Sequence, residues 1–343
     1  MRPTSPQEVA ALLAEASREG RPVTPVGGGT RWRRGRPADP GERLPTEGLG
    51  RIVEHAPADL TVTVEAGVPV TDLARRLADE GQHWAQADVR PGSTVGGVLA
   101  AGASGRSRLR FGPVRDSLLQ VVLVTGDGRV VTAGGKTVKG VAGYDIPRLA
   151  VGSLGTLGVI VQATLKLLPL PQARAWFATE GGLDERAAAA RRVLTEVHRP
   201  GAVLLTPGRL SVELVGIEDD LVGPDGFEPS EAPPEPAGRG LVDAGVPPRE
   251  VARLAAALER RGLGYEAQAG VGVCRVAVDS ADDVAWVRAE ATGLGGHAVV
   301  VDGPDDLRAD PWGPPPPGAE LMRRLKAAFD PAGVLSPGRL AAQ

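Results

Sequence analysis

Asp88-Val-Arg-Pro-Gly-Ser-Thr-Val-Gly-Gly-Val-Leu-Ala-Ala-Gly-Ala-Ser-Gly105 is the stretch of sequence that decides the fold. It places five glycines among small side chains and one pair of hydroxyl residues, Ser93-Thr94. Glycine at this density raises the entropic cost of folding, so it indicates backbone that must approach another group closely. That group is either a bound ligand or a tightly packed helix and strand, and composition alone leaves both interpretations open.

Two further glycine-rich loops lie in the first half of the chain, at 25–30 and 152–158. The first, Pro25-Val-Gly-Gly-Gly-Thr30, follows a predicted strand and can offer successive backbone N–H groups to an anion. It is not a Rossmann loop, because Arg31-Trp-Arg-Arg-Gly-Arg36 follows it instead of an apolar helix. An ordinary glycine turn remains the alternative. Three such loops together predict a large, extended cofactor.

The remaining local patterns predict a mixed chain of helices and strands. Ser5 and Glu8 have the spacing of a capping box, so a helix is expected to begin there and end at Gly20. Residues 60–65 alternate as a strand does, Gly126-Asp-Gly128 indicates a hairpin, and 158–168 predicts another strand. Beyond residue 171, helices over 184–198, 249–261 and 281–292 alternate with strands, which predicts a ferredoxin-like α+β layer. We expect a loop over 223–240 and a stiff linker over 313–318.

Composition excludes several classes of protein. The chain has 343 residues, enough for two domains, and 3% aromatic residues with a formal net charge of −3. These values argue against nucleic-acid binding, which needs clustered basic surface. No apolar run reaches the length of a membrane span, and the N-terminus lacks the apolar core of a signal peptide. We therefore expect a soluble cytoplasmic protein without an integral membrane segment.

The sequence offers few catalytic side chains. No two of its four histidines are spaced to share a metal ion, so no metal site is predicted; they are His55, His83, His198 and His297. The single cysteine, Cys274, cannot form a disulfide or a Cys-ligated iron–sulfur cluster within the chain and is expected to be buried. Gly134-Gly-Lys-Thr137 lacks the spacing and context of an ATP-binding loop. No catalytic residue can be assigned from the sequence.

The loops, in this order, resemble the FAD-binding domain of the vanillyl-alcohol oxidase / p-cresol methylhydroxylase (PCMH) family. Three further segments make the chain similar to the FAD-binding (E) subunits of bacterial glycolate oxidases: Lys136-Thr-Val-Lys-Gly-Val-Ala-Gly-Tyr-Asp-Ile-Pro-Arg-Leu149, Gly152–Ile160 and Ser336-Pro-Gly-Arg-Leu340. The resemblance covers 1–171 and 319–340. It implies a PCMH-type FAD-binding domain of two α/β subdomains at 1–171. A cap domain at 172–318, assigned by position, would follow, and 319–343 would return to complete the FAD domain.

The resemblance also implies which residues hold FAD. The pyrophosphate would lie against Val26, Gly27, Gly28, Gly29 and Thr30, with a positive φ expected at Gly28. The flavin and its ribityl chain would contact Pro91, Gly92, Ser93, Thr94, Gly96, Gly97, Ala103 and Ser104. Gly152, Thr156, Gly158 and Ile160 would contact the adenosine and the flavin, and Arg339 would neutralise phosphate or flavin charge.

The chain differs from these relatives at Gly140 and Ser336, and from flavinylated relatives in its first glycine loop. Gly140 stands where the related subunits usually have asparagine, and Ser336 also replaces an asparagine. Flavinylated relatives carry histidine or cysteine near the first glycine loop, whereas this chain has Thr30-Arg31. The FAD is therefore expected to be bound non-covalently.

The function implied by the resemblance is that of an FAD-dependent oxidoreductase subunit acting on CH–OH groups. Its complex would oxidise glycolate or a similar 2-hydroxy acid, with a catalytic FAD subunit and an iron–sulfur subunit as partners. The complex would be cytoplasmic and could attach peripherally to the inner membrane. A free-standing FAD-linked oxidase of a sugar or alcohol is one alternative, and Tyr265 is the only tyrosine of its cap. A non-catalytic scaffold with a former flavin domain is the other.

Overall fold

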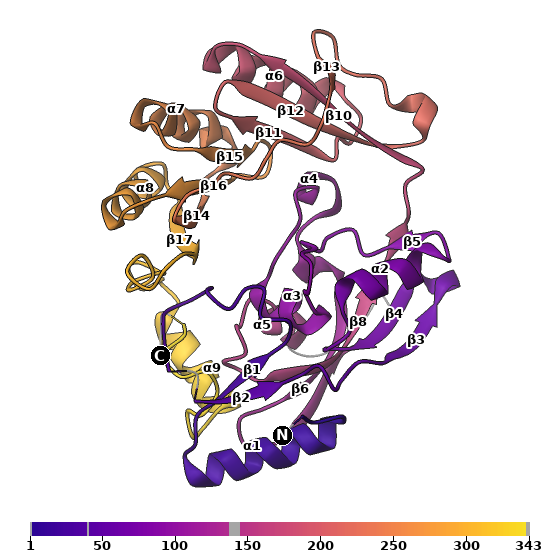
Figure 1. Cartoon of the computed structure of the whole chain (residues 1–343), viewed down its shortest axis with the longest axis vertical. Helices are drawn as coiled ribbons and strands as arrows, with labels where there is room; N and C mark the ends of the chain where they lie inside the picture. Colours follow the sequence, from indigo (N-terminus) through magenta and orange to yellow (C-terminus); the bar gives the residue numbers. More distant parts are fainter. Residues whose placement is uncertain (1, 40, 137–144, 341–343) are drawn as a thin grey trace. The chain divides into compact units, whose positions relative to one another are not determined.

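The computed structural model describes residues 2–39, 41–136 and 145–340 (Figure 1). Gly140 and Tyr144, two residues of the 136–149 motif, lie outside the described residues. The chain divides into two compact units. Unit 1 comprises Met1–Gly105, Pro113–Leu170 and Pro314–Gln343, and unit 2 comprises Arg106–Gly112 and Pro171–Gly313. Unit 2 thus includes seven residues, 106–112, that the sequence-based division assigns to the first domain.

Unit 1 is built on a five-stranded antiparallel sheet with the strand order β3-β4-β8-β6-β7. These strands are Ile52–Ala56 (β3), Thr61–Glu65 (β4), Val159–Lys166 (β8), Leu118–Val124 (β6) and Val130–Gly134 (β7). The strands predicted at 60–65 and 158–168 and the hairpin at 126–128 are therefore confirmed. A separate parallel pair is formed by Val23–Val26 (β1) and Glu42–Pro45 (β2), and a short antiparallel pair by Gln82–His83 (β5) and Leu168–Pro169 (β9).

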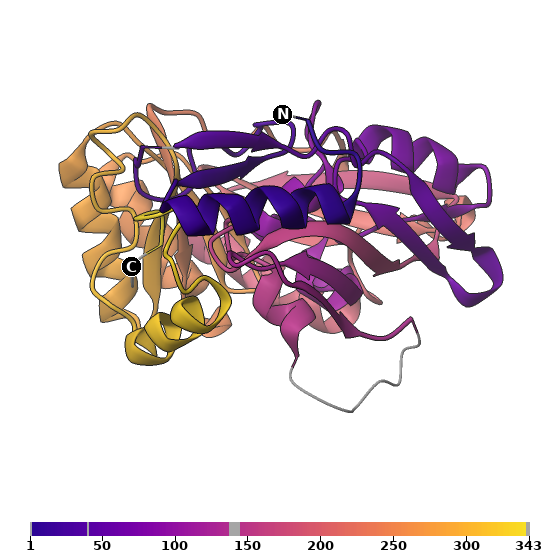
Figure 2. The same cartoon turned by 90° about the horizontal axis from the view of Figure 1, so that it is seen from below.

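The first helix of unit 1, α1 (Pro6–Glu19), packs against both the five-stranded sheet and the β1–β2 pair and joins them in one core. It begins where Ser5 accepts a hydrogen bond from the backbone N–H of Glu8, and it ends at Gly20 with φ of 64°. Its buried face packs on residues of β1, β2, β6 and β8: the cluster is Val9, Leu13, Ala16, Val23, Leu44, Leu49, Val124, Val159, Val161 and Leu335. Figures 1 and 2 show α1 beside β1 and β2.

The C-terminal segment returns to unit 1 and extends the β1–β2 pair. The Val23 N–H donates to the Val334 carbonyl (2.8 Å), and the Ser336 N–H donates to the Val23 carbonyl (2.9 Å). Leu335 between them is fully buried in the α1 core. Removing this segment would therefore uncover apolar side chains and unpaired backbone groups of β1.

A buried ion pair fixes the same segment. Lys326, on α9 (Ala319–Phe329), donates through Nζ to Asp330 Oδ2 (2.6 Å) and to the carbonyls of Thr156 (2.8 Å) and Leu335 (2.7 Å). Asp330 is 2% exposed and accepts the backbone N–H groups of Val334 and Leu335. Burial lowers the pKa of Lys326, and the neighbouring Asp330 carboxylate opposes that effect. The pair joins the C-terminal segment to the loop that contains Thr156.

Among the described residues, each unit contains four further α-helices. Unit 1 contains α2 (Val70–Ala78), α3 (Val95–Ala101) and α5 (Ile146–Ala150) besides α1 and α9. Unit 2 contains the short α4 (Arg108–Phe111) and the longer α6 (Leu183–Glu196), α7 (Val251–Arg261) and α8 (Ala281–Gly293).

Unit 2 contains an eight-stranded antiparallel sheet in the order β13-β10-β12-β11-β15-β16-β14-β17. The strands are Ala173–Glu180 (β10), Ala202–Thr206 (β11), Arg209–Gly216 (β12), Glu228–Ser230 (β13), Gly240–Gly245 (β14), Tyr265–Gln268 (β15), Val273–Val278 (β16) and His297–Asp302 (β17). The run β14-α7-β15-β16-α8-β17 has the βαββαβ order and strand arrangement of a ferredoxin-like unit, as predicted. The run β10-α6-β11-β12 adds an incomplete copy. The expected loop at 223–240 contains the edge strand β13, so that part of the expectation is wrong.

The two faces of this sheet differ in chemistry. One face forms the apolar core with α6, α7 and α8, and it includes Cys274, which is buried as predicted. Burial also raises the pKa of the Cys274 thiol. The other face carries the buried carboxylates of Glu213 and Glu266, each 4% exposed.

Segment 106–112 supplies partners for both carboxylates. The Arg106 Nε donates to Glu266 Oε1 (3.2 Å), and the Ser107 hydroxyl donates to Glu213 Oε2 (2.7 Å). Burial raises the pKa of Glu266, while the charge of Arg106 opposes the rise. These contacts explain why a segment that interrupts unit 1 in the sequence belongs to unit 2.

We predict that Lys326→Met destabilises unit 1 by roughly 3–5 kcal/mol, because it leaves the buried Asp330 carboxylate without its cation. Urea denaturation followed by tryptophan fluorescence measures the change. Arg323→Met on the same helix is the matched control. Its ion pair with Glu320 is exposed, so it should change stability by less than about 0.5 kcal/mol. Equal losses in both variants would contradict the structural role assigned to Lys326.

Candidate cofactor-binding site

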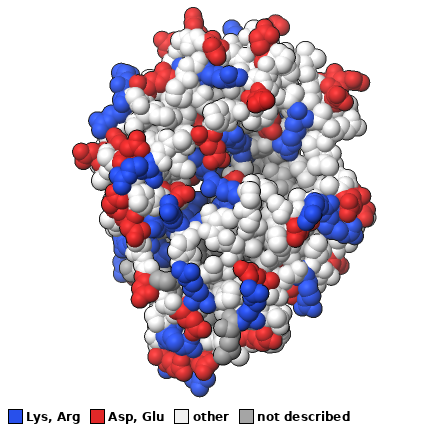
Figure 3. Space-filling model, viewed as in Figure 1, with Lys and Arg blue, Asp and Glu red and all other residues white. Residues whose placement is uncertain are grey.

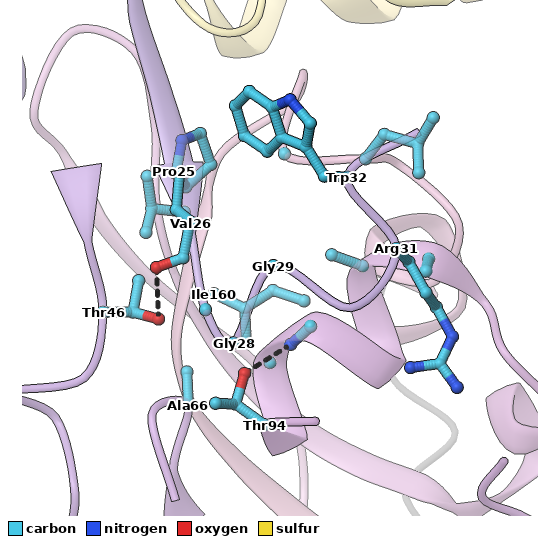
Figure 4. Close-up of a pocket in the computed structure, with 18 of the residues that line it drawn as sticks. Pro25, Val26, Gly28, Gly29, Arg31, Trp32, Thr46, Ala66, Thr94 and Ile160 are labelled. Atoms are coloured by element: carbon cyan, nitrogen blue, oxygen red, sulfur yellow. Dashed lines mark hydrogen bonds between the residues drawn. The ribbon is translucent and has the colours of Figure 1, made fainter. Parts of the chain in front are cut away.

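The three glycine-rich loops meet at one open pocket in unit 1 (Figure 4). It lies between the end of β1 with the loop that follows, the helix α3, and the chain that leads into β8. The lining residues are Pro25, Val26, Gly27, Gly28, Gly29, Thr30, Arg31, Trp32, Thr46, Ala66, Thr94, Gly96, Gly97, Ala100, Ala101, Leu154, Gly155, Gly158, Val159, Ile160 and Arg339. Segments far apart in the sequence thus form one site.

The first two glycine loops pack so closely that side chains cannot fit between them. A Cβ atom at Gly28 would overlap the carbonyl oxygen of Gly92, and one at Gly27 would overlap Thr94 Oγ1. At Gly96 a Cβ would lie 2.7 Å from the Cβ of Ala66 on the chain after β4. The close-packing interpretation of these glycines is therefore confirmed, and this packing also forms part of the pocket wall.

Gly29 has a different role from Gly28. Its φ is +68°, a conformation that favours glycine, and a Cβ there would meet no atom within 4 Å. Gly28 is not among the residues with positive φ, so the expectation of a positive φ at Gly28 is wrong. The left-handed residue of this loop lies one position later and faces open space.

Most of the residues predicted to bind the cofactor line this pocket. They are Val26, Gly27, Gly28, Gly29, Thr30, Thr94, Gly96, Gly97, Gly158, Ile160 and Arg339. Thr94 caps α3, because its Oγ1 accepts the N–H of Gly97 (3.3 Å, Figure 4). The structure brings these residues together, and their individual contacts with a cofactor stay predictions.

The other predicted residues lie outside the lining: Pro91, Gly92, Ser93, Ala103, Ser104, Gly152 and Thr156. Ser93 borders it, since its Oγ lies 3.3 Å from Thr30 Oγ1. Ser104 Oγ accepts the N–H of Val114 (3.0 Å), and the fully buried Thr156 donates its hydroxyl to the Ser153 carbonyl (2.7 Å). The last two hydroxyls are thus engaged by the protein itself.

Two lining residues that sequence reasoning missed follow the first glycine loop directly. Trp32 lies against the guanidinium groups of Arg43 and Arg339, each 5.0 Å from its ring centroid. Arg339 also donates to the carbonyls of Trp32 (2.7 Å) and Arg34 (3.2 Å), which ties the C-terminal segment to this loop. Arg31, the second, contacts Asp88 and Ser93. The basic run 31–36 was the signal that could have identified them.

Most cationic residues of this chain are arginines, so the presence of an arginine alone does not indicate a binding site. Figure 3 shows Lys and Arg interspersed with Asp and Glu over the face in view. The described lining of the pocket is different: its only ionisable side chains are Arg31 and Arg339. Together with the backbone N–H groups of the glycine loop, they suit an anionic ligand that also has flat apolar parts.

Comparison with known families agrees with this geometry. Residues 1–134 match the FAD binding domain family, and residues 314–340 match the C-terminal domain of FAD linked oxidases. The chain is 28% identical to glycolate oxidase subunit GlcE of Escherichia coli, over 90% of this chain and 89% of that subunit. It is 27% identical to glycolate oxidase subunit GlcD of Bacillus subtilis, over 99% of this chain and 88% of that subunit.

Two other similarities are more limited. A D-lactate dehydrogenase of Archaeoglobus fulgidus is 37% identical, but the match spans only 49% of this chain and 38% of that enzyme. Among solved structures, an alkyldihydroxyacetonephosphate synthase has the same fold, with a TM-score of 0.67 over 99% of this chain and 77% of that one. At 16% identity, this likeness concerns the fold alone.

Fold, pocket and domain matches together define an FAD-dependent oxidoreductase. Residues 1–134 and 314–340 thus carry two domains of FAD-linked oxidases, which is consistent with a PCMH-type FAD-binding family. In its described part, no helix combines the length and apolar character needed to cross a membrane.

We predict that Gly28→Ala lowers FAD affinity more than tenfold, because a methyl group there forces the two glycine loops apart. Gly29→Ala adds only backbone strain of about 1 kcal/mol and should weaken FAD binding less. Titration of apoprotein with FAD, followed by flavin fluorescence, measures both. Gly20→Ala is the control, since Gly20 also has positive φ and open space but lies at the end of α1. Equal affinities for the Gly28 and Gly29 variants would contradict the packing argument.

Proposed function

We propose that this chain is the FAD-binding subunit of a complex that oxidises glycolate or a similar 2-hydroxy acid. The observation that carries the proposal is the make-up of the pocket. Its described lining provides cations, hydroxyls and backbone N–H groups but contains no His, Asp, Glu, Lys, Tyr or Cys. The nearly full-length similarity to a glycolate oxidase subunit supports the choice of complex.

The composition of the lining bears directly on the chemistry. Oxidation of a CH–OH group requires a base that accepts the hydroxyl proton, and such a base must lie within hydrogen-bonding reach. FAD, when bound, supplies the electron acceptor. This chain's residues would hold the cofactor: Gly27–Thr30 and Arg31 on the pyrophosphate side, and α3 with Ile160 along its length. Without a base in the described lining, substrate oxidation falls to another subunit.

The partners proposed for the chain follow from this division. A second flavin subunit would carry the substrate site, and an iron–sulfur subunit would take up the electrons. The FAD in this chain would be non-covalent, since the described lining has no histidine or cysteine to form a covalent link. A cytoplasmic complex, attached peripherally to the inner membrane, is the setting that we propose.

The two alternatives are a free-standing oxidase and a flavin-free scaffold. A histidine or tyrosine over the flavin would favour the first, and Tyr265 is the only tyrosine in the cap sequence. Its side chain is 1% exposed in the core of unit 2, and its hydroxyl donates to Glu259 (2.8 Å). Burial also raises the pKa of Tyr265. Tyr265 therefore does not support a free-standing oxidase.

The scaffold alternative is tested by cofactor content. We expect the purified chain to be yellow and to release intact FAD on heat or acid denaturation, because the pocket holds it without a covalent bond. Chromatography of the released flavin against FAD and FMN standards measures this. Release of FMN alone, or absence of flavin after refolding with excess FAD, would refute the cofactor assignment.

The division of labour is tested by anaerobic mixing with glycolate. The FAD of the isolated chain should stay oxidised, because no base is available, and should become reduced once the partner subunits are added. The absorbance of oxidised flavin near the visible maximum follows the reaction. Rapid bleaching of the isolated chain would mean that it is a complete enzyme.

A further inference from the structure

Arg31 is held in place by its hydrogen bonds. Its side chain is 10% exposed, and its guanidinium group has four hydrogen-bond acceptors. One terminal nitrogen donates to the carboxylate (2.7 Å) and the carbonyl (2.8 Å) of Asp88. The other donates to Ser93 Oγ (3.1 Å) and to Thr30 Oγ1 (3.3 Å). Arg31 therefore joins the first glycine loop to the second.

These bonds constrain the hydroxyl hydrogens of Thr30 and Ser93. Each hydroxyl has one hydrogen to donate and two lone pairs to accept. Arg31 occupies a lone pair on each oxygen, and the two oxygens lie 3.3 Å apart. One of the two hydroxyl hydrogens can lie between the two oxygens. At least one hydroxyl hydrogen is then directed to an acceptor other than Thr30 and Ser93. Ser93 is 2% exposed and Thr30 is half-buried, so the protein limits the access of water to both hydroxyls.

The charge of the cluster favours an anionic acceptor. Asp88 also contacts Arg90, whose Nε lies 3.3 Å from the same carboxylate oxygen as the Arg31 nitrogen. Two guanidinium groups thus share one carboxylate, and the three side chains carry a formal charge of +1. Asp88 fixes the direction of Arg31 without cancelling the positive charge beside the loop.

We propose that Arg31 is a positioning residue for the FAD pyrophosphate. Asp88 orients Arg31, and Arg31 holds the Thr30 and Ser93 hydroxyls so that at least one of them donates to a phosphate oxygen and positive charge lies beside both. The inference rests on FAD binding by this pocket. It goes further by assigning a role to three residues. Asp88 orients Arg31, and Arg31 orients the hydroxyl of Ser93 toward the cofactor.

The test compares the affinities of apoprotein variants for FAD and for ADP, which contains the pyrophosphate but no flavin. Arg31→Gln should weaken binding of both probes by about 10- to 100-fold, the range for a lost hydrogen bond to a charged group. Arg31→Lys keeps the charge but loses the fork of donors, so it should restore part of the affinity. Arg33→Gln removes an exposed arginine from the same run and should change either affinity less than about twofold.

A double-mutant cycle separates positioning from an independent contact. If Arg31 acts through Ser93, the losses caused by Arg31→Gln and Ser93→Ala should not add in the double variant. The thermal midpoint of each apoprotein shows whether a variant merely loosens the fold. Should Arg31→Gln not fold, Arg31→Lys and Ser93→Ala carry the cycle instead.

Several results would overturn the proposal. Unchanged FAD affinity in Arg31→Gln would do so, and so would a loss for FAD with none for ADP, which would place Arg31 at the flavin end. Additive losses in the cycle would show that Arg31 does not act through Ser93. A fall in apoprotein stability large enough to account for the affinity loss would assign Arg31 to the fold alone. Failure of the wild-type chain to bind FAD is a separate outcome, which refutes the cofactor assignment itself.

Discussion

The pocket depends on the direct contact of two backbone loops, Gly27–Gly28 against Gly92–Thr94. Only glycine permits this distance, because any Cβ at Gly28 would occupy the position of the Gly92 carbonyl oxygen. The contact aligns the end of β1 with the start of α3, two elements that come from different parts of the sequence. The bonds from Arg31 to Ser93 and Asp88 join the same two loops and therefore require them to be aligned in this way.

The C-terminal segment completes the same architecture from the opposite direction. Leu335 adds to the α1 core beside Val23, while Lys326 reaches the carbonyl of Thr156 on the third glycine loop. Arg339 then contacts Trp32 directly after the first loop. Residues beyond 320 thus contact three parts of the site: strand β1, the third glycine loop, and Trp32 after the first glycine loop. In this chain, the segment that matches the C-terminal domain of FAD linked oxidases therefore helps to hold the glycine loops in place.

Sequence reasoning predicted the parts of the site that are determined locally. Glycine spacing, the Ser5 cap and the alternating strand at 60–65 depend on near neighbours and can be read directly. Two of the lining residues that it missed, Arg31 and Trp32, join the site through partners such as Asp88 and Arg339 that no local pattern links to them. Thr156 illustrates the opposite case: its hydroxyl is engaged by Ser153, a contact that a motif match cannot reveal.

Charged side chains stabilise local structure in both units of this chain. In unit 1, the described pocket lining contains arginine as its only ionisable residue type, and both of those arginines also stabilise the loop structure. In unit 2, the buried carboxylates Glu213 and Glu266 are each engaged by residues of segment 106–112. Glu266 forms an ion pair with Arg106, and Glu213 forms one with Arg174 on β10. These carboxylates therefore attach segment 106–112 and β10 to the sheet, so they stabilise the fold of unit 2 as the two arginines of the pocket stabilise the loops of unit 1.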